Sequence, residues 1–336
     1  MEGPKTKFCV ANNNRGDCIP RITKRFAPHL EEFFGSAPPD ISGSARLVTS
    51  HSTTESLKRD ICEARRHGVG YNVLLNSIVH PQLTDTNFMK RICGFLELIA
   101  EWGATAVTIT DTFLMDVAAE HRSKKSLPLK IVASSWCDIL GPTKAKRIEG
   151  RGADRIILHQ DANRNIADLG AIISQVKCEV ELLANNGCLY RCDARQAHRV
   201  FQSLHSTSGE RIADPFRAEC IRIRREDPFE ILLSPTIRPE DVGLYESMGF
   251  HLFKIAGRLQ STDWLEYVVE AYVKREFNDS LPKLASTNDG EKLPRICNKR
   301  LDGFLQFVTA GHALGYTERV REFYDKFLEN NLHQDT

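Results

Sequence analysis

The stretch YNVLLNSIVHPQLTDTNFMKRICGFLELIAEWGATAVTIT, residues 71–110, decides the fold. Its apolar run at residues 71–76 predicts a buried strand, and apolar side chains recur at helical spacing across residues 87–102. Gly103 stands where a helix is expected to end, and a second apolar run follows at residues 106–110. A strand, a helix and another strand in this order predict a parallel βαβ unit.

The same alternation continues along most of the chain. Further strands are expected at Phe8–Ala11, Glu32–Gly35, Lys130–Ser134, Arg155–His159, Glu179–Ala184, Ile231–Ser234 and His251–Ala256. Further helices are expected at residues 239–248 and 263–277, the second with Thr262 as its N-cap. This pattern predicts an α/β fold, a closed TIM-like (β/α)8 barrel, in preference to an open doubly wound sheet. No GxGxxG or Walker-type loop follows a strand in the sequence to favour the open sheet.

Local composition divides the chain into three parts. Residues 1–277 are expected to form the barrel, including a cysteine-bearing excursion on its rim at residues 185–230. Residues 278–294 are rich in Asn, Asp, Ser and Pro, which predicts a polar linker. Residues 295–336 are expected to form a C-terminal helical segment.

The overall composition argues against several function classes. With 45 Lys and Arg against 44 Asp and Glu, the net charge of +1 gives no global attraction to nucleic acid or to an anionic membrane. Nucleic acid is therefore disfavoured as a partner. No apolar run approaches the about 20 residues of a membrane span. Residues 1–5 carry no basic and apolar leader, so a cytoplasmic protein with reduced thiols is expected.

Ten cysteines are the unusual count, and two of them follow a predicted strand closely. Cys188 and Cys192 come just after residues 179–184, and the carboxyl ends of barrel strands carry the functional sites. Cys220 is a third candidate ligand. The fourth ligand has three candidates: Cys297, Cys137 and His198. Thiolate-rich sites bind zinc or iron-sulfur clusters. The spacing alone does not distinguish between these two, and it also allows cysteines that lie on the barrel rim and bind no metal.

The motif Phe253–Arg258 is the second informative feature. Alternation along a strand puts Lys254 and Arg258 on the same face, opposite to Phe253. If that face lines the barrel lumen, two cations at its mouth suit a carboxylate or a phosphate, and we expect them to bind substrate. The alternative is a salt bridge inside the barrel, for example to Glu181.

Asn76 and His80 lie at the end of the strand that opens residues 71–110. His80 is the candidate for proton transfer near neutral pH, and Asn76 is a candidate for substrate binding. The alternative for His80 is a capping or packing role in the loop. The sequence contains no GxSxG or HExxH motif, so no motif in it supports a hydrolase.

These residues resemble a known family. Residues 74–77 followed by His80, residues 129–134 and above all residues 237–258 resemble the collagenase-like peptidase family U32. The resemblance covers roughly residues 5–275, and residues 297–304 are similar to a C-terminal segment of some members.

The resemblance implies a TIM-like barrel and, in some branches, a 4Fe-4S cluster held by four cysteines. Those branches carry out oxygen-independent hydroxylation of ubiquinone precursors or of RNA bases, with prephenate implied as oxygen donor in some. The family pattern implies Cys188, Cys192 and Cys220 as ligands here, with Cys297 as the fourth. The cysteine spacing departs from the hydroxylase branches, which leaves the substrate and the reaction open.

The sequence therefore predicts an iron-sulfur oxidoreductase, a hydroxylase or a related enzyme, acting on a small or peptide-like anionic substrate. Two alternatives remain: a peptidase, in keeping with the family name, and a non-catalytic barrel stapled by zinc. In the zinc alternative the chain serves as one subunit beside a homologous partner subunit.

Overall fold

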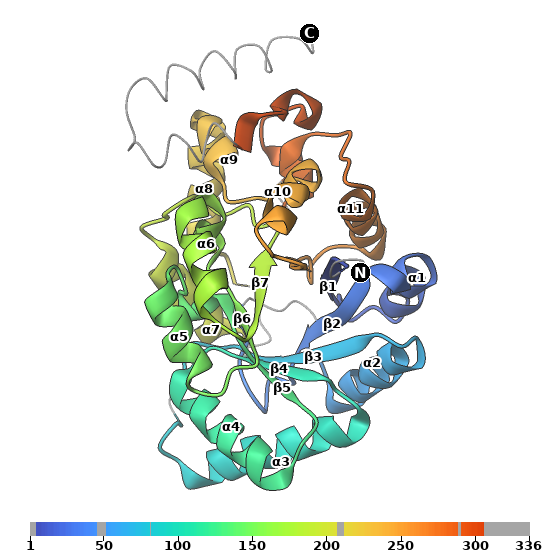
Figure 1. Ribbon diagram of the computed structural model, residues 1–336, viewed down its shortest axis with the longest axis vertical. Helices are drawn as coiled ribbons and strands as arrows, with labels where there is room; N and C mark the ends of the chain where they lie inside the picture. The colour runs from blue at the N-terminus through green and yellow to red at the C-terminus, as the bar shows by residue number, and fades with distance from the viewer. Residues whose placement is uncertain (1–4, 46–51, 81, 207–211, 288–289, 306–336) are drawn as a thin grey trace.

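The computed structural model describes residues 5–45, 52–80, 82–206, 212–287 and 290–305 (Figure 1). Within these residues, eight parallel strands pair in chain order and close into a barrel, with β8 hydrogen-bonded to β1. The strands are β1 (Lys7–Ala11), β2 (Leu30–Ser36), β3 (Gly70–Leu75), β4 (Ala106–Ile109), β5 (Lys130–Ala133), β6 (Arg155–Ile157), β7 (Glu179–Leu183) and β8 (Leu252–Ile255). The predicted TIM-like barrel is confirmed.

Helices surround the barrel and connect its strands (Figure 1). They are α1 (Cys18–Phe26), α2 (Thr54–Arg66), α3 (Thr86–Trp102), α4 (Thr112–Lys125), α5 (Pro142–Glu149), α6 (Ile166–Gln175), α7 (Arg195–His205), α8 (Pro215–Glu226), α9 (Phe229–Leu233), α10 (Val242–Ser247) and α11 (Thr262–Lys274). Gly103 ends α3 in the left-handed region, at φ 98°, as its position predicts. The N-cap of α11 is Ser261 and not Thr262, because the Ser261 side chain accepts the N–H of Trp264.

One predicted strand is wrong. Residues 231–234 belong to the short helix α9 and the residue after it. Every residue from Phe229 to Leu233 except Glu230 is buried, so the run has no polar face to reveal its period. A short, continuous apolar run does not distinguish a buried strand from a buried helix.

The segments after β8 differ in part from the predicted division. Residues 278–294, predicted as a polar linker, contain a 3-10 turn, Leu281–Leu284, whose leucines are buried. Ser280 also forms an antiparallel bridge with Cys297, so this segment packs onto the rest of the chain. A second 3-10 turn, Asn298–Leu301, follows; residues 306–336 of the predicted C-terminal helical segment lie outside the described residues.

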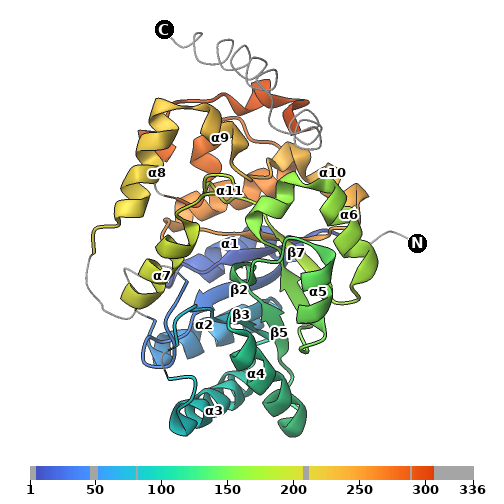
Figure 2. The ribbon, with the colours of Figure 1, turned by 90° about the vertical axis from the view of Figure 1, so that its left-hand side faces the viewer.

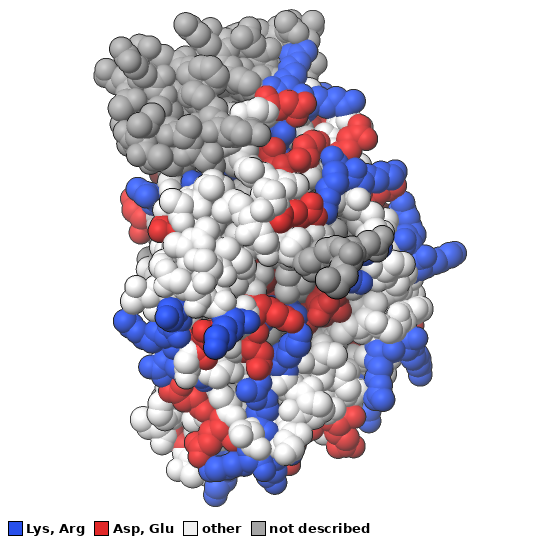
Figure 3. Space-filling view, in the orientation of Figure 1, with Lys and Arg blue, Asp and Glu red and all other residues white. Residues whose placement is uncertain are grey.

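The cysteine-bearing excursion contains α7 and α8, which follow β7 and lie at the periphery of the barrel (Figure 2). Basic and acidic side chains are interspersed on the face drawn in Figure 3, in keeping with the balanced charge. None of the helices in the described part of the chain has both the length and the apolar composition that crossing a membrane requires.

Candidate functional site

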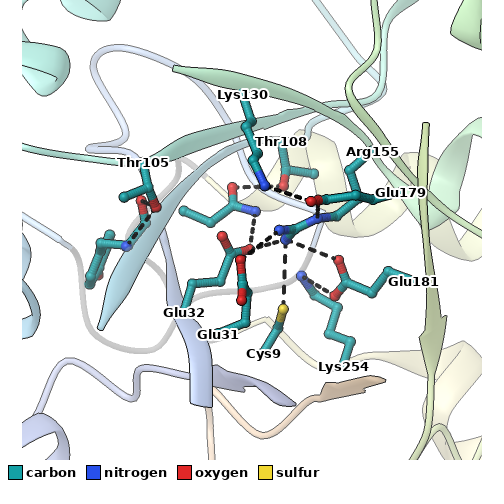
Figure 4. A network of polar contacts seen from close by, with 12 residues as sticks. Cys9, Glu31, Glu32, Thr105, Thr108, Lys130, Arg155, Glu179, Glu181 and Lys254 are labelled. Carbon is teal, nitrogen blue, oxygen red and sulfur yellow. Dashed lines mark hydrogen bonds and ion pairs between the residues drawn. The ribbon is translucent and has the colours of Figure 1, made fainter. Parts of the chain in front are cut away.

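The barrel interior holds a network of charged side chains centred on Arg155 of β6 (Figure 4). Its side chain is fully buried and donates to Glu32 at 2.7 Å and to Glu179 at 2.8 Å, while Glu181 lies 3.5 Å away. Asn72 also donates to Glu32, at 2.8 Å. Buried charges persist only when they are paired, so this network is self-compensating.

The same network brings three metal-ligating groups together. Among the described residues, Cys9, Glu32 and Glu181 form the one group of three such side chains whose donor atoms all lie within 4.8 Å of one another. The Arg155 guanidinium already lies 3.7 Å from the Cys9 sulfur and contacts both carboxylates. Burial raises the pKa of Cys9 well above its usual value, so it is a thiol and not a thiolate. The guanidinium therefore supplies the positive charge that a metal ion would bring.

Lys254 of β8 links this network to the mouth of the barrel. Its Nζ lies 3.7 Å from Oε1 of Glu181, the ion pair that the sequence offered as an alternative. The same Nζ lies 3.7 Å from the centre of the Phe34 ring and has no hydrogen-bond partner. The ion pair does not exclude substrate binding, because Lys254 also lines a cavity.

The cavity has a volume of about 70 Å³ and lies at the carboxyl ends of the strands. Its polar lining includes Asn76, Asn186, Lys254, Arg258 and Ser286, and its apolar lining includes Phe34, Leu74, Trp136 and Leu183. The structure thus brings together the three predicted substrate-binding residues Asn76, Lys254 and Arg258.

Two of these polar residues are held in place by neighbouring groups. Arg258 donates to the hydroxyl of Ser36 and, at 3.1 Å, to that of Ser44. Asn76 accepts the N–H of Ala45 at 3.2 Å. The Ser286 hydroxyl is buried without a hydrogen-bond partner. Among the described residues, the donors of Ser286 and Lys254 in the cavity wall have no hydrogen-bond acceptor, which suits an anionic ligand.

The loop after β7 carries Cys188 and Cys192 beside this cavity. Asn186 lines the cavity, and its side-chain oxygen accepts the N–H of Cys188 at 2.8 Å. Asn186 thus connects the cavity wall to the loop that carries the two cysteines.

Cys220 approaches the same loop from α8. Arg224, one turn later, donates to the carbonyl of Cys220 at 3.1 Å and to the carbonyl of Gly187 at 2.8 Å. Burial raises the pKa of Cys220 to about 11; the charge of Arg224 lowers it, and the neighbouring thiols Cys188 and Cys192 raise it. Burial also raises the pKa of Cys192, which lies beside Cys188. Arg224 therefore connects Cys220 to the start of the loop that carries Cys188 and Cys192.

Each candidate for the fourth ligand has contacts of its own. Cys297 forms the bridge with Ser280. The Cys137 thiol is buried and contacts the carbonyl oxygen of Thr110 at 3.2 Å. His198 contacts Asp214 at 2.8 Å and stacks on Phe216. The assignment of Cys297 stays a prediction.

His80 lies in the loop after β3, with its ring 6.1 Å from that of Phe88. Burial lowers its pKa, although the charge of Asp111 opposes this, and its Nε2 is buried without a hydrogen-bond partner. His80 is not among the residues that line the cavity. Its role in proton transfer stays a prediction.

Sequence reasoning missed Phe34, Trp136 and Ser286 as cavity residues. Ser286 lies in the segment predicted as a linker. It reaches the cavity because that segment packs against the mouth of the barrel, which no local sequence pattern shows.

The protein is a TIM barrel with a polar cavity at the carboxyl ends of its strands, which is where TIM-barrel enzymes have their active sites. The chain belongs to peptidase family U32, whose family model matches residues 41–306.

Two relatives extend this result. The uncharacterized protease MJ1657 of Methanocaldococcus jannaschii is 26% identical over 275 residues, which are 80% of each protein. The solved structure of the U32 peptidase Mk0906 matches with a TM-score of 0.56 and 17% identity, covering 76% of this chain and 93% of that one. At this identity the second match supports the fold alone.

Proposed function

We propose that the protein is an iron-sulfur enzyme that carries out a redox modification, such as oxygen-independent hydroxylation, of a small or peptide-like anionic substrate. The observation that carries this proposal is that Arg224 connects Cys220 to the Cys188–Cys192 loop, and that Asn186 connects this loop to a cavity lined by two cations. Family U32 membership supports an enzyme in general terms.

Thiolate side chains bind both zinc and iron-sulfur clusters, and the resemblance to the cluster-binding branches of the family favours the cluster here. The positive charge of Arg224 opposes the burial that raises the pKa of Cys220, and a bound metal centre would supply the further positive charge that a thiolate needs.

These three cysteines would hold the cluster, with Cys297 as the proposed fourth ligand. When bound, the cluster supplies one-electron transfer or, at an iron without a protein ligand, a position for an oxygen-bearing group. The chain's own residues do the rest: Lys254 and Arg258 attract and orient the anion, and Asn76 and Ser286 offer it polar contacts.

Anaerobic purification and reconstitution, followed by iron and sulfide analysis, tests this proposal. We expect about four irons and four sulfides per chain, and strong loss of both in C192S and C220S. C178S is the matched control, because Cys178 lies at the other end of β7 and hydrogen-bonds to Glu149. A colourless, iron-free protein after reconstitution would overturn the proposal, and one equivalent of zinc would favour the stapled, non-catalytic alternative.

A peptidase is the second candidate, and the names of the two relatives favour it. It predicts that the purified chain cleaves members of a peptide library and that K254M abolishes the cleavage. Cleavage by an iron-free chain would establish this alternative over the first.

A further inference from the structure

The loop that carries Cys188 and Cys192 is fastened at two points by a buried ion pair. Arg195, the first residue of α7, donates to the carbonyl of Leu189 at 2.6 Å. Asp161, which follows β6, accepts the N–H of Arg191 at 3.1 Å. Leu189 and Arg191 both lie between the two cysteines in the sequence.

The two fastening side chains also bind each other. Arg195 donates to Oδ2 of Asp161 at 2.9 Å, and their side chains are only 11% and 9% exposed. A third side chain completes the arrangement, because Arg195 also lies 2.8 Å from Nε2 of His159. A planar guanidinium holds several acceptors in fixed directions, which a lysine does not.

The loop needs such support. Arg191 has φ 49°, in the left-handed region that residues with a side chain rarely adopt. The hydrogen bond from its N–H to Asp161 compensates for this backbone conformation.

We propose that the buried Asp161–Arg195 pair is a positioning device that fixes the Cys188–Cys192 loop at the mouth of the barrel. The role of the thiols rests on the proposed function, but the positioning itself does not. Asp161 and Arg195 act through the loop and are positioning residues, not catalytic ones.

The test is the alkylation rate of each cysteine by iodoacetamide in the iron-free chain, followed by peptide mass spectrometry. We expect R195M to raise the rates at Cys188 and Cys192 at least about tenfold, because the loop then opens more often. Cys93 on α3 is the internal reference and is expected to keep its rate. R195K is expected to keep the charge and still free the loop, and D161N gives the same test if R195M does not fold.

The matched control is R199M, one turn further along α7. The Arg199 side chain is also buried, with 4% exposed, and pairs with Asp138 at 2.5 Å, without a contact to residues 188–192 among its described hydrogen bonds. Equal acceleration in R195M and R199M, or parallel acceleration at Cys93, would mean a general loss of stability and would overturn the proposal.

Iron analysis of the wild type separates this proposal from the proposed function. A chain without iron whose loop is freed in R195M contradicts only the function, and an iron-binding chain whose loop is unaffected contradicts only the positioning role.

Discussion

The Nζ atom of Lys254 lies 3.7 Å from Oε1 of Glu181, where the charged interior of the barrel meets the cavity at its mouth. Glu181 is fully buried, while Lys254 reaches the cavity wall. The lysine therefore links the buried carboxylate to the cavity. We expect an anion in the cavity to bind its ammonium group.

Lys254→Met is expected to weaken binding of small anions by roughly 10- to 100-fold, since a hydrogen bond to a charged group contributes about 1.5–3 kcal/mol. The measurement is the shift in melting temperature with pyruvate, oxalate and phosphate, which reports affinity through stabilisation of the folded state. K274M is the control, because Lys274 is 63% exposed and pairs with Glu270 on the surface. Equal shifts in K254M and the wild type would exclude the cavity as the anion site.

Ser286→Ala is expected to weaken the same binding by roughly 2- to 10-fold, the effect of losing one neutral hydrogen bond. Folding stability is expected to stay unchanged or to rise slightly, because the Ser286 hydroxyl is buried without a hydrogen-bond partner. Denaturant unfolding and the same ligand titration measure the two effects. A large loss of stability without a change in affinity would assign Ser286 to the fold alone.

Arg155→Met is expected to lower the free energy of unfolding by about 3–5 kcal/mol, because it leaves Glu32 and Glu181 buried without their main cation. The matched control is R151M, which removes an exposed pair with Asp116 and is expected to cost at most about 1 kcal/mol. Urea unfolding followed by circular dichroism compares the two variants. A small effect of R155M would show that the carboxylates are protonated and do not need the guanidinium.

The pH dependence of stability has a component from His159. Burial, together with the charges of Arg195 and Arg199, lowers the pKa of His159 from 6.5 to about 3. Between these two pH values the unfolded chain binds the proton and the folded chain does not, so this contribution is full above pH 6.5 and is lost as the pH falls toward 3. We expect H159Q to be less sensitive to pH over this range in urea unfolding, and an unchanged slope would contradict the assignment.

The sequence predicted the barrel well because strand burial and helical period are local properties. It also predicted that Lys254 and Arg258 lie on one side, and both line the cavity, although β8 ends at Ile255 and Arg258 lies in the turn after it. The strand predicted at residues 231–234 failed because an apolar run without a polar face has no visible period.

Other parts of the site depend on contacts between distant segments, which no local pattern shows. Cys220 meets Cys188 because α8 folds back on the loop after β7, and the position of Cys297 depends on how the chain returns after β8. The pairing of Asp161 with Arg195 joins residues from two different connections, and neither residue lies in a motif.

The central claim is that the three thiols and the anion cavity form a single site. Its most direct test is electron paramagnetic resonance of the reconstituted, reduced chain, recorded without and with pyruvate, oxalate or phosphate. We predict the signal of a reduced 4Fe-4S cluster that is absent in C220S and that changes when the anion binds the wild type. In K254M the signal is expected to be present and insensitive to the anion. The absence of a cluster signal in the wild type, or a signal that no bound anion alters, would contradict the account.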